Sequence, residues 1–276
     1  MAENAIAVFK GGTSLSKGYK LIERFSEDVD ILIVPPQSIG PSARHGILKR
    51  VEVATAIHLG LGEPDIELVQ STTGVKRNVR YPYKAGFDLG VLSEGVLLEM
   101  GVRGGPYPRT TMAIDSYVAA FAKGELGLPV DEFEEFEPVH IDVLASERTL
   151  VEKLALLHDL ASRFPEPAAV TALQRSGRHF YDVYRLLGHA ATCEACAVPG
   201  TVSTLAVDVD HKSEEYGWSS TPRPEGGYAV SPAFDPSHAS NGVARAGFEI
   251  AAQLIYGLVP SFNDCMQRVR QRNDLV

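Results

Sequence analysis

Two aspartates separated by a single residue begin an apolar segment in the first part of the chain. Asp28 and Asp30 are followed by Ile-Leu-Ile-Val, and a proline pair ends the segment. Alternate side chains of a strand lie on the same face, so a strand here points both carboxylates in one direction. Neighbouring carboxylates are costly to bury without a counter-charge, and Mg²⁺ binds a few carboxylates together with nucleotide phosphates. The spacing favours a metal site; alone, it also fits a solvated acidic loop before an ordinary strand.

A glycine pair lies upstream, in the sequence Gly11-Gly12-Thr13-Ser14. Glycines let the backbone approach a ligand closely, and the first N–H groups of a helix attract phosphate. The hydroxyls of Thr13 and Ser14 can cap the helix or donate to a ligand. A glycine pair by itself is typical of a tight strand-to-helix turn. Followed by the two aspartates, it favours a site that holds a metal-bound nucleoside triphosphate.

The surrounding elements must position these groups. Apolar periodicity predicts a strand over residues 5–9, a helix after the glycine pair with Leu15, Tyr19 and Ile22 on one face, and a strand over 28–34. Further elements are expected as helices over 42–61, 117–122, 147–164, 170–187 and 241–256, and as strands over 65–69, 75–83, 95–102 and 139–144. A charged loop over 131–137 and a Pro-, Gly- and Ser-rich loop over 219–236, within an irregular stretch over 199–238, complete the prediction. The chain is therefore predicted to hold an α/β domain over 1–145 and a helical domain over 146–276.

Composition restricts the class of protein. Hydrophobic residues make up 45% of the 276 residues and charged residues 22%, which is ordinary for a soluble globular protein. No stretch approaches the roughly 20 apolar residues of a membrane span, and three cysteines suit a reducing compartment. We therefore expect a cytoplasmic protein with no membrane partner. The net charge of −9 argues against nonspecific coating of nucleic acid but allows a local basic groove.

Four stretches resemble the AbiEii toxin family of nucleotidyltransferases: residues 9–15 (FKGGTSL), 23–32 (ERFSEDVDIL), 146–154 (SERTLVEKL) and 178–184 (RHFYDVY). The resemblance covers most of the chain. The family supplies toxins of bacterial toxin–antitoxin and phage-abortive-infection systems, including a mycobacterial type that modifies tRNA. It implies a DNA polymerase beta-like fold, with a mixed-sheet α/β nucleotidyltransferase core followed by a helical C-terminal domain and an active site in the cleft between them.

Lys153 is unusual for its place on the predicted helix. On a helical wheel it falls among Leu154, Leu157 and Leu160. A lysine in an apolar arc is costly unless it meets an anion, although it can also extend its ammonium group to solvent. The resemblance implies an anion, because the matching lysine of the family lies in the active site near the triphosphate.

Asp182 lies on the polar face of its predicted helix, between Arg178 and Arg185. The wheel alone predicts a surface ion-pair network, which contributes little to stability. The resemblance instead implies an active-site aspartate that positions or deprotonates the acceptor hydroxyl, with the two arginines facing phosphate.

A third carboxylate is common in polymerase beta-like sites. Glu99 is the first candidate, as a lone acid in an apolar strand followed by Gly101, and Glu67 is the second. Ser26 precedes Asp28 by two residues, so a phosphate on Ser26 would add about −1.5 to −2 charges beside the carboxylates. We predict that this modification, made by a partner antitoxin, inactivates the enzyme; the alternative is that Ser26 only caps the turn.

Together these observations predict a metal-dependent nucleotidyltransferase that uses Mg²⁺ or Mn²⁺ and a nucleoside triphosphate. By resemblance, the acceptor is the tRNA 3′ end, transfer blocks translation, and a cognate antitoxin is the regulator. Two alternatives stay open. The chain could transfer nucleotides to protein or to a small molecule, or it could be a nucleotide- or antitoxin-binding module without catalysis.

Overall fold

The computed structural model describes residues 5–26, 28–36, 39–84, 86, 94–129, 133–218 and 220–276. Two compact units make up the chain. The first comprises Met1–Lys20 and Ser26–Leu144, and the second comprises Leu21–Phe25 and Ala145–Val276. The short segment Leu21–Phe25 therefore packs with the second unit, although the residues on both sides of it belong to the first. Glu27 and Asp131–Glu132, within the motif and loop predicted above, lie outside the described residues.

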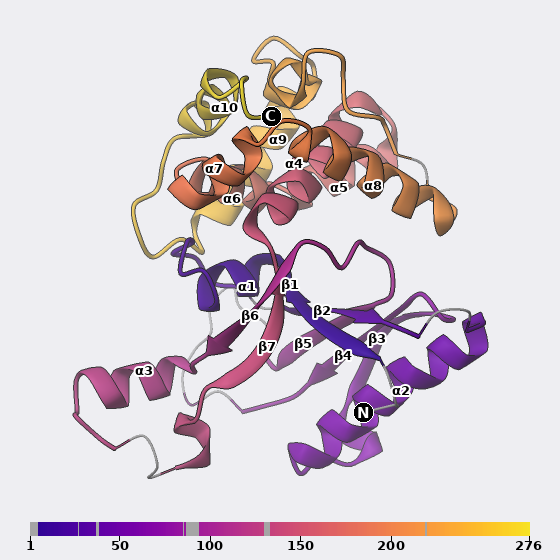
Figure 1. Cartoon of the computed structure of the whole chain (residues 1–276), viewed down its shortest axis with the longest axis vertical. Coiled ribbons are helices and arrows are strands. Elements are labelled where there is room, and N and C mark those ends of the chain that lie inside the picture. Colours follow the sequence, from indigo (N-terminus) through magenta and orange to yellow (C-terminus); the bar gives the residue numbers. More distant parts are fainter. Residues whose placement is uncertain are drawn as a thin grey trace. The chain divides into compact units, whose positions relative to one another are not determined.

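A seven-stranded mixed sheet forms the first unit, in the order β3-β4-β5-β2-β1-β7-β6 (Figure 1). Its central strand β2 pairs antiparallel with β1 and parallel with β5, while β1 pairs parallel with β7. The outer pairs β3–β4, β4–β5 and β6–β7 are antiparallel. The strands are β1 (Ile6–Lys10), β2 (Asp28–Val34), β3 (Glu67–Thr72), β4 (Lys76–Tyr81), β5 (Val96–Gly101), β6 (Arg109–Ile114) and β7 (Val139–Leu144).

Short and long helices flank this sheet. The helices are α1 (Gly11–Lys17), α2 (Pro41–His58), α3 (Tyr117–Gly124) and the 3-10 turns η1 (Glu63–Asp65) and η2 (Glu134–Phe136). Helix α1 contacts β1 and β2, and α2 packs on β4 with Ile47 and Leu48 buried. Helix α3 packs against η2 through the buried Ala119, Ala122 and Phe136. The sheet centre therefore carries α1 directly beside the aspartate strand.

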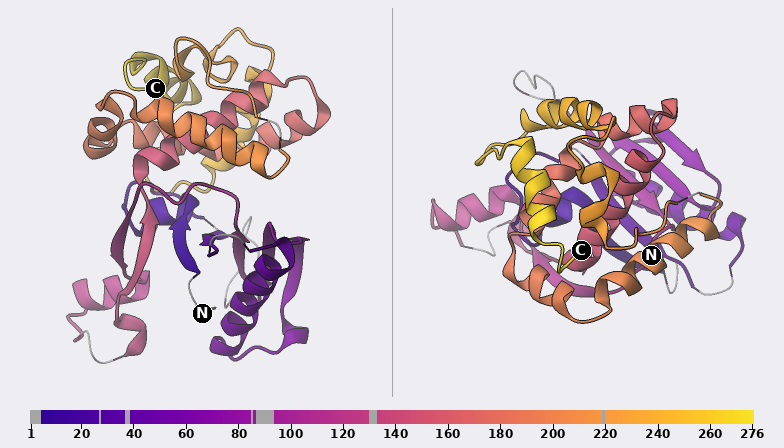
Figure 2. Two further views of the ribbon diagram at one scale, coloured as in Figure 1. Left: turned by 45° about the vertical axis from the view of Figure 1, so that its right-hand side comes forward. Right: turned by 90° about the horizontal axis from the view of Figure 1, so that it is seen from above.

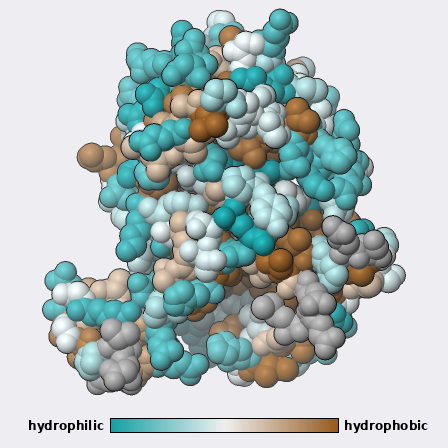
Figure 3. Space-filling model, in the orientation of Figure 1, coloured by the Kyte–Doolittle hydropathy of each residue, from teal (hydrophilic) through white to brown (hydrophobic). Residues whose placement is uncertain are grey.

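The second unit is helical (Figure 2). Helix α4 (Ser146–Ser162) is its central element, since it contacts α5, α6, α7, α8 and two 3-10 turns, and its leucines at 150, 154, 157 and 160 are buried. The surrounding elements are α5 (Pro167–Arg175), α6 (Arg178–Leu186), α7 (Ala190–Ala197), α8 (Thr201–Glu215), η3 (Tyr228–Val230), η4 (Pro232–Phe234), α9 (Asn241–Ala252) and α10 (Phe262–Gln271). No single helix in the described ranges is long and apolar enough to cross a membrane, although α7 and α8, bent by 88°, meet the length and composition test as a pair. The face drawn in Figure 3 is mainly hydrophilic, with hydrophobic side chains in a few patches.

The predicted α/β class with a mixed sheet is confirmed, and several elements differ from their predictions. Helix α1 already begins at Gly11 and ends at Lys17, so Tyr19 and Ile22 lie beyond it and neither Thr13 nor Ser14 is its N-cap. Strand β6 was not predicted, because its residues pair only with β7 at the sheet edge and show no apolar alternation.

In the second unit, the helix predicted over residues 170–187 is divided into two helices, α5 and α6. The chain turns at Ser176 and Gly177, between α5 and α6, where a Cβ on Gly177 would lie 2.1 Å from the carbonyl carbon of Gly247. The backbones at Gly177 and Gly247 therefore pack closely at the point where α5 and α6 are separated. The residues expected to be irregular over 199–238 contain α8, and α10 was also not predicted.

Candidate active site

Three carboxylates of the first unit lie on two neighbouring strands, β2 and β5. Asp28 and Asp30 lie on β2, where Asp30 is directly opposite Glu99 of β5 and Lys10 of β1. Since directly opposed residues of a sheet point to the same face, Asp30, Glu99 and Lys10 share one face, and Asp28 lies on it two residues earlier. All four residues are half-buried.

Glu99, rather than Glu67, lies beside the two aspartates. Burial, followed by the charges of Asp30 and Asp28, raises the pKa of Glu99, while Lys76 acts in the opposite direction. The amide Nδ2 of Asn78 donates to Oε1 of Glu99. Glu67 lies on the edge strand β3 with its side chain 69% exposed, and its Oε2 is 3.5 Å from Arg80 Nε. The strand register therefore selects between the two candidates.

The residues of this face fit a divalent cation. Burial and the charges of Asp30 and Asp28 together raise the pKa of Glu99, and a hard cation would relieve the repulsion among the three carboxylates. Among the described residues, no group of three or more His, Cys, Asp or Glu side chains is placed so that it could hold a metal ion by itself. Mg²⁺ does not require such a group, since it commonly binds one or two carboxylates together with substrate phosphates. Asp28 and Asp30 are the residues that would hold it.

The glycine turn lies against Asp30. Gly11 has φ of +73°, and a Cβ at this position would lie 2.0 Å from Oδ2 of Asp30. Thr13 Oγ1 donates to the carbonyl oxygen of Asp28, and Ser14 Oγ donates to that of Gly11 at 2.9 Å. Ser14 and Gly12 are buried, so the two hydroxyls stabilise the turn. Phosphate binding by residues 11–14 stays a prediction.

Replacing Gly11 by alanine is expected to lower nucleotide transfer at least tenfold more than replacing Gly127 by alanine. Both glycines have positive φ, +73° and +65°, so both variants carry similar backbone strain of roughly 1–2 kcal/mol. Only the Gly11 variant places a methyl group on Asp30, because no atom lies within 4 Å of a Cβ at Gly127. Transfer rates and melting temperatures of both variants test this. Equal losses of activity would show that the close approach to Asp30 has no functional role.

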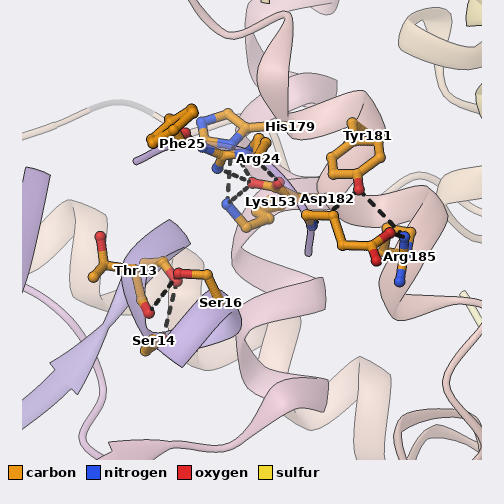
Figure 4. Close-up of polar contacts among 12 residues, drawn as sticks. Thr13, Ser14, Ser16, Arg24, Phe25, Lys153, His179, Tyr181, Asp182 and Arg185 are labelled. Carbon is orange, nitrogen blue, oxygen red and sulfur yellow. Dashed lines mark hydrogen bonds and ion pairs between the residues drawn. The ribbon is translucent and has the colours of Figure 1, made fainter. Parts of the chain in front are cut away.

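A second group of ionic side chains, the Asp182 cluster, lies in the helical unit (Figure 4). It consists of Arg24, Lys153, His179 and Asp182. Arg24 contacts Asp182 twice, from Nε to Oδ1 and from Nη2 to Oδ2, both at 2.8 Å. Lys153 Nζ is 2.8 Å from Oδ2 of Asp182 and 3.0 Å from Nδ1 of His179. Asp182 is fully buried, so the surface ion-pair network predicted from the helical wheel is wrong.

The charges of the Asp182 cluster are set by these contacts. Burial alone raises the pKa of Asp182, but Arg24 and Lys153 outweigh it and hold the pKa well below its usual range. Burial and the charge of Lys153 lower the pKa of His179 to about 3, so its imidazole is neutral and Nδ1 accepts from Lys153. An ionised Asp182 with such a low pKa is a weak proton acceptor. The geometry favours a role in positioning Lys153 over one in deprotonating an acceptor hydroxyl.

The two arginines predicted to face phosphate have different surroundings. Arg185 Nη1 donates to Glu23 Oε2 at 2.8 Å and to the Tyr181 hydroxyl at 3.3 Å. Arg178 is exposed, and its charge adds a smaller contribution to the burial that lowers the pKa of Lys153 and of His179. Their contact with phosphate stays a prediction.

Arg24, Asn78 and His179 were not among the predicted site residues. His179 precedes Asp182 by three residues on α6, a spacing that places two side chains on one helix face and could have indicated their contact. Arg24 stands within the motif next to Asp28, but its partner Asp182 is 158 residues away. Asn78 meets Glu99 only through the pairing of β4 with β5.

Similarity to known proteins extends over most of the chain. Residues 2–236 match the family model described as nucleotidyl transferase AbiEii toxin, type IV TA system. No curated protein matches the chain significantly. Among solved structures, the chain is similar to MenT4, a nucleotidyltransferase toxin from Mycobacterium tuberculosis H37Rv, with 19% identity and a TM-score of 0.43 over 98% of this chain and 82% of that one. Since the family model spans most of the sequence, this chain belongs to the AbiEii family of nucleotidyltransferase toxins of type IV toxin–antitoxin systems.

Proposed function

We propose that this chain transfers a nucleoside monophosphate from a nucleoside triphosphate to an acceptor hydroxyl, in a metal-dependent reaction. The observation that carries the proposal is the meeting of Asp28, Asp30 and Glu99 on β2 and β5, with the Gly11 turn against Asp30. Carboxylates placed together beside a close backbone approach are suited to a cation–triphosphate pair. Family membership supports transferase activity.

Each residue then has a defined task. Asp28 and Asp30 would hold Mg²⁺ or Mn²⁺, and Glu99 would complete the carboxylate set. When bound, the cation supplies electrostatic stabilisation of the charge that develops on the triphosphate. Gly11 keeps the turn close to Asp30, so that the backbone of residues 11–14 is available to phosphate. Within the helical unit, we assign Lys153, Arg178 and Arg185 to phosphate groups, with Asp182 holding the Lys153 ammonium in place.

For the acceptor we propose the 3′ end of tRNA, whose modification blocks translation in the cytoplasm. The proposed regulator is a cognate antitoxin. Membership of a family of type IV toxin–antitoxin toxins supports such a partner. Membership of a nucleotidyltransferase family supports catalysis over a binding module without catalysis.

The test is to incubate the full chain and Mg²⁺ with each labelled triphosphate in turn, in the presence of total RNA, total protein or a small-molecule extract. We expect label in the tRNA fraction, dependent on divalent cation and absent after chelation. Label in protein or in a small molecule would replace tRNA as the acceptor. No incorporation with any triphosphate or acceptor would contradict the transferase proposal.

Ser26→Asp is expected to reduce triphosphate binding and transfer at least tenfold, whereas Ser26→Ala should keep both. Ser26 is half-buried and precedes Asp28 by two residues, so an added negative charge lies close to the carboxylates and competes for the cation. Calorimetric titration with the preferred triphosphate and the transfer rate measure the two effects. If the aspartate variant is fully active and the alanine variant is not, the hydroxyl has a structural role and regulation by phosphorylation is wrong.

A further inference from the structure

Two segments far apart in sequence lie side by side in the helical unit. The backbone N–H of Phe25 donates to Leu254 O at 2.9 Å, and that of Tyr256 donates to Glu23 O at 2.9 Å. An isolated β-bridge joins Arg24 to Ile255. The two hydrogen bonds lie on either side of this bridge, and together they join the segment Leu21–Phe25 to the connection between α9 and α10. The backbone at Phe25 and Tyr256 is therefore fixed.

The pairing presents two aromatic rings to solvent. The ring centroids of Phe25 and Tyr256 are 5.6 Å apart with an interplanar angle of 68°, and the side chains are 52% and 58% exposed. Leu258, two residues further on, is 88% exposed. We call Phe25 and Tyr256 the aromatic platform. An exposed aromatic pair on a rigid backbone is typical of a binding surface, because the molecule gains little from it in isolation.

Positive charge borders the aromatic platform. Arg24 Nη1 donates to the carbonyl oxygen of Phe25 at 2.9 Å, and Figure 4 shows Phe25 beside Arg24 and His179. Arg24 and Lys153 are paired with Asp182, Arg185 is paired with Glu23, and Arg178 is exposed. His179 is neutral, because its pKa is lowered to about 3 by burial and by Lys153. Arginine side chains therefore lie next to the aromatic platform, in a chain whose net charge is −9.

This combination selects one class of ligand. Unpaired bases stack on exposed aromatic rings, and neighbouring cations attract the phosphates that connect them. A paired duplex keeps its bases stacked on one another and cannot use the rings in this way. A protein partner could cover the rings, but the exposed Arg178 and the partly exposed Arg185 complement the phosphates of a polyanion.

We propose that Phe25 and Tyr256 stack against unpaired bases of an RNA acceptor and thereby select a single-stranded end. The proposal rests on the proposed transferase function and names how its acceptor is bound. Tyr256 lies beyond residues 2–236, the part of the chain that the family model matches.

The direct test is RNA binding by the full chain, which needs no catalysis. The probe is a fluorescein-labelled RNA hairpin with an unpaired 3′ end, compared by anisotropy with the same hairpin made blunt. We expect the wild-type chain to prefer the unpaired end and Tyr256→Leu and Phe25→Leu to lose roughly tenfold or more in affinity for it. Tyr256→Trp should keep the affinity, because indole also stacks. Trp218→Leu is the matched control, since it removes another exposed aromatic of the same unit.

A second readout reports stacking itself. In a Trp218→Phe background, the introduced tryptophan of Tyr256→Trp is the sole indole, since Trp218 is the only tryptophan of the chain. Its fluorescence should be quenched by the unpaired hairpin and much less by the blunt one. In transfer assays, Tyr256→Leu should raise the KM for RNA, with the melting temperature unchanged.

The outcomes separate the two proposals. Unchanged affinity of Tyr256→Leu and Phe25→Leu for the unpaired hairpin, in chains that melt like wild type, overturns the platform and leaves the transferase function intact. So does a wild-type chain that does not distinguish the two hairpins. Loss of antitoxin binding with RNA binding kept would assign these rings to a protein partner instead. Normal RNA binding without any nucleotide transfer would contradict the transferase function alone.

Discussion

Replacing Asp30 by asparagine is expected to lower nucleotide transfer by about a thousandfold or more, which corresponds to roughly 4 kcal/mol of transition-state stabilisation. Asparagine keeps the size of the side chain beside Gly11 but removes the charge that a divalent cation needs. Asp28→Asn should have a similar effect. Because both side chains are half-buried at the mouth of β2, the melting temperature should change little. Labelled triphosphate incorporation and thermal unfolding measure the two quantities.

Glu67→Gln is the matched control for these variants. It removes a carboxylate of the same sheet, from an edge strand where the side chain is 69% exposed. It should therefore transfer at the wild-type rate. Calorimetric titration with Mn²⁺ adds a readout that does not require turnover, and the Asp30 variant should bind the ion much more weakly. Wild-type activity in Asp28→Asn or Asp30→Asn would contradict the assignment of the carboxylates to a catalytic cation.

Replacing Asp182 by alanine is expected to reduce the free energy of unfolding by about 3–5 kcal/mol. The carboxylate is fully buried and neutralises both Arg24 and Lys153, so its removal leaves two buried cations without their counter-charge. Its pKa is lower in the folded than in the unfolded state, so the stabilisation is present above the unfolded pKa of about 3.9 and is lost as pH falls toward the folded value. Asp182→Asn removes the same charge and keeps the size of the side chain. In urea unfolding at neutral and acidic pH, the difference in the free energy of unfolding between this variant and wild type should become smaller below about pH 4.

Lys153→Met is the informative partner of that variant. Methionine removes a buried ammonium group, while Asp182 keeps both of its hydrogen bonds to Arg24. The free energy of unfolding should therefore stay the same or rise slightly, and transfer should be abolished if Lys153 serves phosphate. Normal transfer by Lys153→Met would make the Asp182 cluster purely structural. A large loss of stability would mean that the lysine is an essential ion-pair partner.

Local pattern was sufficient for part of the fold and the candidate site. The alternation in Asp28-Val29-Asp30 and the glycines before it predict a strand, a turn and two carboxylates on one face, and these features are confirmed. The leucine spacing of α4 likewise predicts a helix with Lys153 in its apolar arc, where the residue is buried. Each of these features depends on residues a few positions apart, which is why the sequence alone determines them.

The choice among distant groups required the tertiary structure. The opposition of β2 and β5 brings Glu99 rather than Glu67 to Asp30, and the packing of Leu21–Phe25 with the helical unit makes Arg24 the partner of Asp182. Helical periodicity places Asp182 on a polar face, and contacts with Lys153 and with Arg24, 158 residues away, bury that face. Strand register and burial arise from contacts between segments that the chain brings together on folding. The residues next to each other in the sequence do not indicate those contacts. A local sequence pattern therefore cannot distinguish a buried ion pair from a solvated one.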